Sequence, residues 1–292
     1  MDKLKKNRFV YIIKIGITFT ILFFIFKNIS VHTLLSNFKH LGYTTVFLLI
    51  VSSTVKYSIR FYNWGKYLKI NPDYTPKRNE ILKSTFIGTS LQFILPGGYG
   101  TFGKMYYVDN DKSSTFISVT LEKFFLTWTN LTAAAFASIY YFKLWPFYAR
   151  IAIFVFMLSL PFLLFFSQSI LKRTKYQKFI EYVKAYKKLT PRIIALQIVY
   201  MFITFFQYHA IINHFAELSF SKIIISTPLV ILANSIPISY SGLGLRETFA
   251  LEVFSKYGIA SEVIITATLT VFFFNTVIPA LVGLGIIIRQ KR

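Results

Sequence analysis

The chain has 292 residues, of which 54% are hydrophobic and 15% are charged, and it contains no cysteine. A soluble domain usually carries about 25% charged residues, so an ordinary soluble protein is excluded, as are disulfides and thiolate chemistry. The 33 Lys and Arg residues outnumber the 11 Asp and Glu residues, which indicates nucleic acid or an anionic membrane surface as the partner.

Long apolar runs decide for the membrane and against nucleic acid, because a helix crosses a bilayer with roughly 20 apolar residues. The first run has a basic flank but no A-x-A cleavage site, so we expect a retained helix. Two shorter runs, 81–95 and 223–238, each end in a turn rich in Pro and Gly. The runs of spanning length are 9–26, 41–55 continuing toward Tyr62, 115–142, 146–169, 193–212 and 263–288.

Basic segments predict the topology, because Lys and Arg accumulate on the cytoplasmic side. All four basic segments lie on the cytoplasmic side only if both short runs turn back within the membrane. These segments are 3–8, 60–83, 172–192 and 289–292. The prediction is an all-α polytopic membrane protein with about six spanning helices. Two re-entrant helical hairpins enter in inverted orientation, and the N- and C-termini are cytoplasmic. The alternative is that the short runs are kinked spanning helices or tight external loops.

The predicted organisation is a single integral membrane domain over residues 1–292. Its first half is 1–168, with a hairpin at about 79–112, and its second half is 193–292, with a hairpin at about 222–257. Between them, 169–192 predicts a basic cytoplasmic amphipathic linker helix that suits anionic lipid headgroups or is simply solvated. A smaller interfacial helix is expected at 31–41. The apolar residues of the linker are Tyr176, Phe179, Ile180, Val183 and Tyr186.

The first turn, "LPGGYGTFGK", fits two nucleotide-binding patterns, G-x-G-x-x-G and G-x-x-x-x-G-K. Both require strands, and Met105 stands where a phosphate loop needs Ser or Thr, so nucleotide binding is rejected. Within a membrane, Pro96 ends the preceding helix and glycines permit a turn. A half-helix then begins near Phe102 with Lys104 in its first turn, which predicts an anion site. The glycines of this turn are Gly97, Gly98, Gly100 and Gly103.

The second turn, "NSIPISYSGLGLRETFA", repeats this pattern: Pro237 ends a half-helix, and Arg246 and Glu247 open the returning helix. Two similar broken segments entering from opposite faces are typical of inverted-repeat transporters with a site near the midplane. The turn itself is formed by Ser239, Ser241, Gly242 and Gly244.

Glu122 is a carboxylate within an apolar helix, where ionisable groups usually face a cavity or a partner. It is a candidate partner for Lys104 or Arg246, or a proton-coupling group; alternatively, it forms an interfacial pair with Lys123. Arg60 and Trp64 read as an interface anchor. His209 and His214 lack metal-site spacing, so neither a metal nor another cofactor is expected.

"PISYSGLGLRE" resembles the P-x-x-x-G-G-L-G-V-R-E-type signature of the lysylphosphatidylglycerol synthase transmembrane-region family. The first turn resembles the family's L-P-G-R-x-G-E-x-x-R segment, and the resemblance covers nearly the whole chain. This chain has Gly98 where the family often has Arg, and Thr101 where the family often has Glu. An Arg that is common in a late helix of the family is absent around 272–275. The matching positions are Leu95, Pro96, Gly97, Gly100 and Lys104; Pro237, Gly242, Leu243, Gly244, Arg246 and Glu247; the Glu122–Lys123 pair; and Arg60 with Trp64.

The resemblance implies a stand-alone flippase-like protein of the cell membrane, multi-pass and not an enzyme, because the soluble aminoacyl-transferase domain is missing. It would move an anionic phospholipid or lipid-linked sugar headgroup between the hairpins. The alternatives are a non-transporting partner of a glycosyltransferase or lipid-synthesis enzyme, and a lipid-modifying enzyme, for which no nucleophile stands out. Expected partners are anionic lipids and a possible second copy. Expected substrate-binding residues are Lys104, Arg246, Glu247, Glu122, Gly98, Gly100, Ser239 and Ser241.

Overall fold

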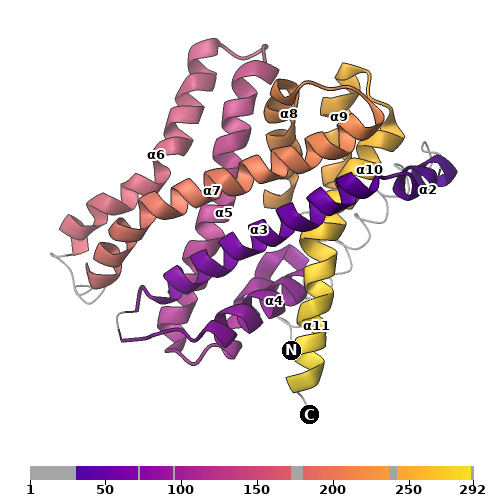
Figure 1. Cartoon of the computed structure of the whole chain (residues 1–292). Coiled ribbons are helices and arrows are strands. Elements are labelled where there is room, and N and C mark those ends of the chain that lie inside the picture. The colour runs from indigo at the N-terminus through magenta and orange to yellow at the C-terminus, as the bar shows by residue number, and fades with distance from the viewer. Residues whose placement is uncertain (1–30, 72, 95, 172–179, 237–241, 291–292) are drawn as a thin grey trace, which may run out of the picture.

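The computed structural model describes residues 31–71, 73–94, 96–171, 180–236 and 242–290, and its regular elements are all helices (Figure 1). The all-α prediction is therefore confirmed for this part of the chain. The predicted span 9–26 lies outside the described residues. The first half contains α2 (Val31–Lys39), α3 (Tyr43–Leu68), α4 (Arg78–Ile94), the 3₁₀ helix η1 (Pro96–Tyr107), α5 (Lys112–Tyr141) and α6 (Phe147–Leu171).

The second half begins with α7 (Ile180–Phe215), which contains Pro191 and is continuous through the boundary predicted at 192. The part of the predicted linker that the structure describes, from Ile180 onward, is thus the start of this long helix. Tyr176 and Phe179 lie outside the described residues. The remaining elements are α8 (Phe220–Leu232), η3 (Ala233–Ser235), α9 (Leu245–Phe254), η4 (Ser255–Tyr257), α10 (Ser261–Phe272), the π-helix η5 (Phe273–Val277) and α11 (Ile278–Gln290).

The helix contacts of the first half recur in the second. α3 packs against α4 and α5, and α7 packs against α8 and α10. η1 contacts α4 and α5, and α9 contacts α8 and α10. Across the halves α3 packs against α7, while α4 packs against α11 and α8 against α5. Figure 1 places the α4–η1 unit and the α8–α9 unit at opposite ends of the molecule.

The segment after α4 differs from the expected half-helix starting near Phe102. It is a 3₁₀ helix that begins at Pro96, runs for 12 residues and packs against α4. A Cβ added at Gly100 would lie 2.0 Å from the carbonyl oxygen of Leu91, so the two backbones are in direct contact. Gly103 meets the Leu91 side chain in the same way. Glycine supplies this close approach and also lowers α-helix propensity, which explains the tighter helix.

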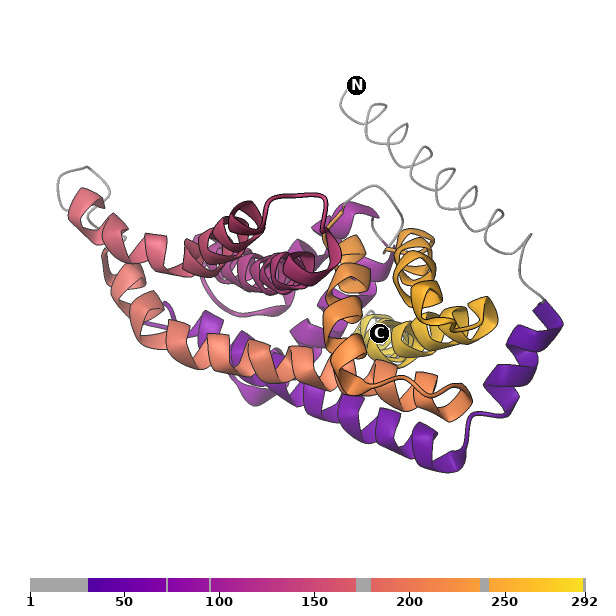
Figure 2. The same ribbon diagram turned by 90° about the horizontal axis from the view of Figure 1, so that it is seen from above.

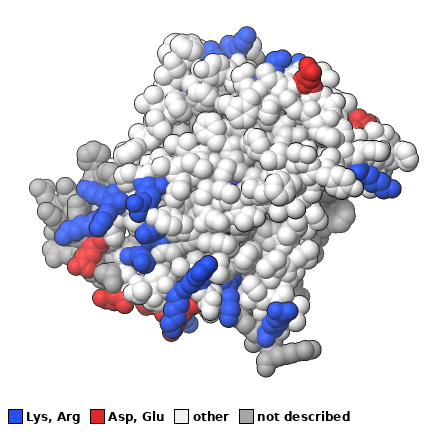
Figure 3. All heavy atoms as spheres, in the orientation of Figure 1, with Lys and Arg blue, Asp and Glu red and all other residues white. Residues whose placement is uncertain are grey.

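The outer faces of the long helices are apolar. Exposed Val, Leu, Ile and Phe side chains occur on α3, α6, α7 and α11. In the face shown in Figure 3, Lys and Arg gather toward the lower left and the bottom, with a few at the top, and a wide uncharged band lies between. Such a band is typical of a surface that contacts hydrocarbon.

By length and composition, two described helical stretches could cross a membrane, Glu181–Phe215 and Ser261–Arg289. Phe147–Leu163 and Phe220–Ser235 are apolar but shorter. α3 and α5, with 26 and 30 residues, exceed the roughly 20 residues of a span, but polar side chains lower their mean hydropathy. The count of about six spans, the re-entrant hairpins and the side of each terminus therefore stay predictions.

Candidate functional site: a cationic cavity between the two halves

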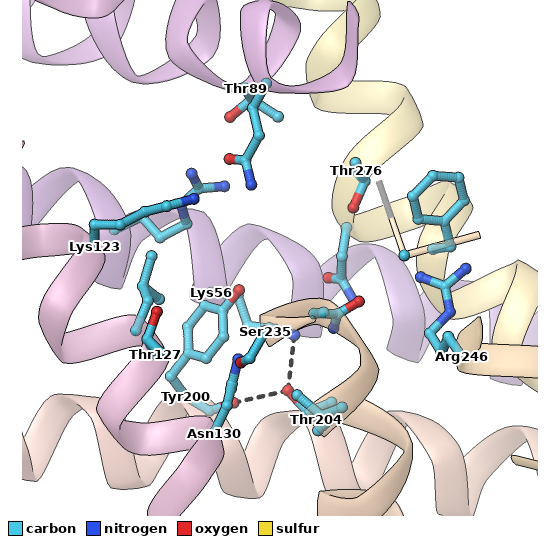
Figure 4. Close-up of a pocket in the computed structure, with 18 of the residues that line it drawn as sticks. Lys56, Thr89, Lys123, Thr127, Asn130, Tyr200, Thr204, Ser235, Arg246 and Thr276 are labelled. Carbon is cyan, nitrogen blue, oxygen red and sulfur yellow. Dashed lines mark hydrogen bonds between the residues drawn. The ribbon is translucent and has the colours of Figure 1, made fainter. Parts of the chain in front are cut away.

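A cavity of about 570 Å³ lies where the two halves meet. Helices α3, α4, α5, α7, α8 and α10 line it together with η1, η3, η5 and the start of α9. Figure 4 shows side chains from these segments converging on one space. Its charged lining residues are Lys56, Arg60, Glu122, Lys123 and Arg246; its polar neutral ones include Thr89, Gln92, Thr101, Thr127, Asn130, Tyr200, Thr204, Asn234, Ser235, Asn275 and Thr276.

Helical spacing brings these groups to one side of each helix. Lys56 and Arg60 are four residues apart on α3, as are Tyr200 and Thr204 on α7. Residues four apart lie one above the other on the same helix face. The opposite faces of α3 and α7 expose apolar side chains, so both helices are polar toward the cavity and apolar outward.

Lys104 forms a buried ion pair with Glu122 and lies behind the cavity wall. Its side chain is 2% exposed, its Nζ donates to Glu122 Oε2, and it stands 3.5 Å from the centre of the Trp64 ring. Trp64 is held in turn by a 2.8 Å hydrogen bond from Nε1 to Ser84 Oγ. Glu122 lines the cavity whereas Lys104 does not. The structure thus places Lys104 as the counter-ion that orients Glu122.

Arg246 forms the second buried ion pair, with its neighbour Glu247. The Arg246 Nη2 lies 2.7 Å from Glu247 Oε1, and the guanidinium carbon is 4.5 Å from the centre of the Phe272 ring. Glu247 Oε2 accepts the Gly244 backbone N–H at 2.7 Å and so caps the start of α9. Gly244 and Gly242 have φ of 83° and 78°, angles that favour glycine. The predicted helix N-terminus is therefore not open to a ligand, because the Glu247 carboxylate already occupies it.

The remaining predicted positions are distributed unevenly. Gly242 borders the cavity, and Gly100 and Gly103 serve the contact between η1 and α4. The backbones of Pro96, Gly97 and Gly98 form the first turns of η1. Pro237, Ser239 and Ser241 lie outside the described residues.

Sequence reasoning missed the contribution of α3. Lys56 is 3% exposed, and its Nζ donates to Thr204 Oγ1 at 2.8 Å (Figure 4). The same Nζ lies 3.4 Å from Gln207 Oε1. Arg60 donates from Nη1 to Tyr57 Oη at 3.0 Å. The available signal was the four-residue spacing of these two cations in an apolar helix, but the interface-anchor prediction combined Arg60 with Trp64 and left Lys56 out.

A network of amides borders Lys56 at the π-helix. Asn275 Nδ2 donates to Gln207 Oε1 at 2.8 Å, and Gln207 Nε2 donates to Ser52 Oγ and Ser53 Oγ at 3.0 Å. Asn275 lies in the π-helical turn, and this turn directs its side chain toward the network. In a regular α-helix the side chain at this position would point in another direction. The family's late-helix Arg would fall in this region, so here neutral amides occupy it.

Positive charge exceeds negative charge around the cavity. Its lining contains four cations and one carboxylate, and that carboxylate is already paired with Lys104. Arg246 is paired with Glu247, whereas Lys56 and Arg60 have no carboxylate partner among the described residues. Buried charges are costly unless they are paired, so these two cations favour an anionic ligand. Among the described residues, no group of three or more His, Cys, Asp or Glu could hold a metal ion.

The fold and the cavity are those of a helical membrane protein with an internal polar site. The sequence model of the lysylphosphatidylglycerol synthase TM region matches residues 11–283, and the chain belongs to this family. The resemblance inferred from the two turns is thereby confirmed. Membership connects the protein with lipid metabolism or translocation in a membrane. No curated protein and no solved structure matches the chain.

Proposed function

We propose that this protein is a lipid flippase that moves an anionic phospholipid or lipid-linked sugar headgroup through the cavity between its two halves. The observation that carries the proposal is the surplus of cations lining a cavity between the two halves of a membrane protein. A headgroup phosphate compensates that surplus while the acyl chains remain in the hydrocarbon. Charged residues within membrane segments commonly mark such a pathway.

The repeated contacts of the two halves support alternating access. Related units such as α4–η1 and α8–α9 border the same cavity from opposite ends of the molecule. In inverted-repeat transporters, rocking one unit against the other exposes a central site to each side in turn. We place the protein in the cell membrane as a multi-pass chain, with both termini cytoplasmic and the two hairpins re-entrant.

The two buried ion pairs fit the resting state of such a cycle. When the cavity is empty, Glu122 and Glu247 compensate Lys104 and Arg246. An entering phosphate competes with Glu247 for Arg246, and its departure restores the pair. The chain needs no chemical conversion of the lipid for this cycle, so we propose a carrier rather than an enzyme.

The test is transport by the purified full-length chain in liposomes that contain a fluorescent anionic lipid. We expect wild-type protein to expose the lipid to an external quencher, and Arg246→Ala to slow this by about tenfold or more, since a charge-assisted hydrogen bond is lost. The control Lys256→Ala removes an exposed cation from the same region and leaves the rate unchanged. Arg246→Lys, which keeps the charge, retains part of the rate.

Two outcomes would overturn the proposal. One is the absence of movement of any anionic lipid by a well-folded protein. The other is a rate that Arg246→Ala and Lys256→Ala leave equally unchanged. Lipid binding without movement, together with an enzyme that co-purifies and depends on the chain, would favour the non-transporting partner instead.

A further inference from the structure

Lys56 is a buried cation that faces the cavity and contacts only neutral groups. Its Nζ is held by the hydroxyl of Thr204 and lies 4.4 Å from the centre of the Tyr200 ring. Within the part of the chain that the structure describes, no carboxylate lies within ion-pair distance of it. A buried ammonium without a counter-ion is costly, so this position favours an anionic ligand.

Arg60 lies one turn further along α3 and lines the same cavity. Its guanidinium carbon is 5.0 Å from the centre of the Tyr57 ring, and its Nε is buried without a hydrogen-bond acceptor. No carboxylate among the described residues pairs with it either. A guanidinium presents several donors in a planar fork that fits phosphate oxygens. Lys56 and Arg60 together therefore form a two-cation seat, with donors unused on at least one of them.

Neutral hydrogen-bonding groups line the cavity beyond this seat. Thr127 of α5, Asn234 of η3 and Thr276 of η5 face the cavity, and the described residues provide no partner for their side chains. Hydroxyl and amide groups of this kind both donate and accept, as sugar and polyol hydroxyls do. They would complement a headgroup with neutral hydroxyls attached to its phosphate.

A cationic headgroup finds no complementary group here. Glu122 is paired with Lys104, and both carboxylate oxygens of Glu247 are taken by Arg246 and the Gly244 N–H. An ammonium would face four lining cations and one carboxylate, Glu122, which is already paired with Lys104, and like charges at short range repel.

From these observations we infer that Lys56 and Arg60 form the phosphate subsite, and that the cavity selects a lipid whose phosphate carries a neutral polyol or sugar and rejects an aminoacylated one. This inference rests on the proposed entry of an anionic headgroup past Arg246, and it adds which residues hold the phosphate once it is inside the cavity and which headgroup is chosen. It also separates this chain from the aminoacylated lipid named in the family's title.

The first experiment measures lipid selection by the wild-type chain in phosphatidylcholine nanodiscs. Lipids compete with a fluorescent phosphatidylglycerol for the protein. Phosphatidylglycerol and phosphatidylinositol should compete at least about tenfold better than lysylphosphatidylglycerol. They should also outcompete phosphatidylmethanol, which has the same phosphate charge without hydroxyls. Soluble glycerol phosphate serves as the free-anion arm and should compete poorly, since it lacks the acyl chains.

The second experiment locates the phosphate seat. Lys56→Gln and Arg60→Gln should each weaken phosphatidylglycerol binding by about tenfold. Lys69→Gln, an exposed position at the end of the same helix, should leave it unchanged. Arg60→Lys keeps the charge and should retain part of the affinity. Thermal unfolding of each variant shows whether it is folded, and the wild-type lipid series does not depend on the variants.

The outcomes separate the two proposals. If lysylphosphatidylglycerol binds as well as phosphatidylglycerol, the selectivity is wrong while a lipid carrier stands. If folded Lys56→Gln and Arg60→Gln bind normally, the phosphate seat is elsewhere. If phosphatidylmethanol matches phosphatidylinositol, the hydroxyl contacts are overturned, and if glycerol phosphate competes as well as the lipids, the ligand is a soluble anion. If no anionic lipid binds, the proposed function fails together with this inference.

Discussion

The chemistry of this protein is concentrated in a few buried charges. Lys104 and Arg246 occur in the two Pro/Gly-rich turns, and each is paired with a carboxylate. The two pairs differ in use, because Glu122 and Arg246 reach the cavity whereas Lys104 and Glu247 stand behind them. Each ion pair therefore offers the cavity one charge and supports it with the opposite one.

Removing one partner of the Lys104–Glu122 pair should be strongly destabilising. Glu122→Gln leaves an ammonium buried without a counter-ion, and we expect it to lower the free energy of unfolding by about 3–5 kcal/mol. The matched control Glu252→Gln breaks an exposed pair with Lys256 and should change stability little. Denaturant unfolding in detergent measures both. The double variant Lys104→Met, Glu122→Gln should recover most of the loss, and equal stability of Glu122→Gln and wild type would contradict the pair.

The residues of the site were predictable where local sequence chemistry marks them. Pro and Gly followed by a basic residue identified Lys104, Arg246 and Glu247, and an isolated carboxylate identified Glu122. Lys56 was not singled out, and Arg60 was predicted with Trp64 as an interface anchor, because a cation in an apolar helix fits an anchor as well as a cavity wall. Only the packing of α3 against α7 determines whether that face of α3 points toward the lipid or toward the cavity.

At the level of elements, the positions of most helices follow from apolar runs. The runs at 41–62, 115–142 and 146–169 correspond to α3, α5 and α6. The departures are local: the 3₁₀ helix η1, the π-helix η5 and the unbroken α7. The helices η1 and η5 accompany particular contacts, Gly100 against Leu91 and Asn275 against Gln207, which no hydrophobic period reports.

The packing of α11 on α4 offers a test at this scale. A Cβ at Gly283 would lie 2.1 Å from Ser90 Oγ and 2.2 Å from the Phe86 carbonyl oxygen, whereas Gly285 has nothing within 4 Å. Gly283→Ala should therefore cost about 1–3 kcal/mol by overpacking. Gly285→Ala, the same change in the same helix, should be neutral or stabilising because alanine favours helix. Thermal unfolding compares them; equal melting temperatures would show that the two helices do not approach this closely.

At the scale of the whole molecule, the arrangement of the two halves was the hardest feature to predict. Charge bias and two similar turns indicate an inverted repeat, but they do not reveal that α4 packs on α11 while α8 packs on α5. Because each half packs against the other in this way, segments of both halves surround one cavity. The substrate route we propose therefore depends on long-range contacts rather than on any one motif.

The predicted topology can be measured independently of transport. Reporter fusions after Lys112 and after Tyr257 follow the two hairpin units. Opposite sides of the membrane are expected, because the units lie at opposite ends of the molecule. The same side for both would contradict the inverted orientation and leave the cavity without access from both faces.

The absence of cysteine makes a direct test of the route possible. Thr127→Cys places a single thiol on the cavity wall, and Thr120→Cys places one on an exposed part of the same helix. Both variants are labelled to completion with a bulky maleimide, and movement of a fluorescent anionic lipid is followed in liposomes. Labelling at residue 127 should stop lipid movement while labelling at residue 120 leaves it intact. Undiminished movement with residue 127 fully labelled would contradict a route through the cavity.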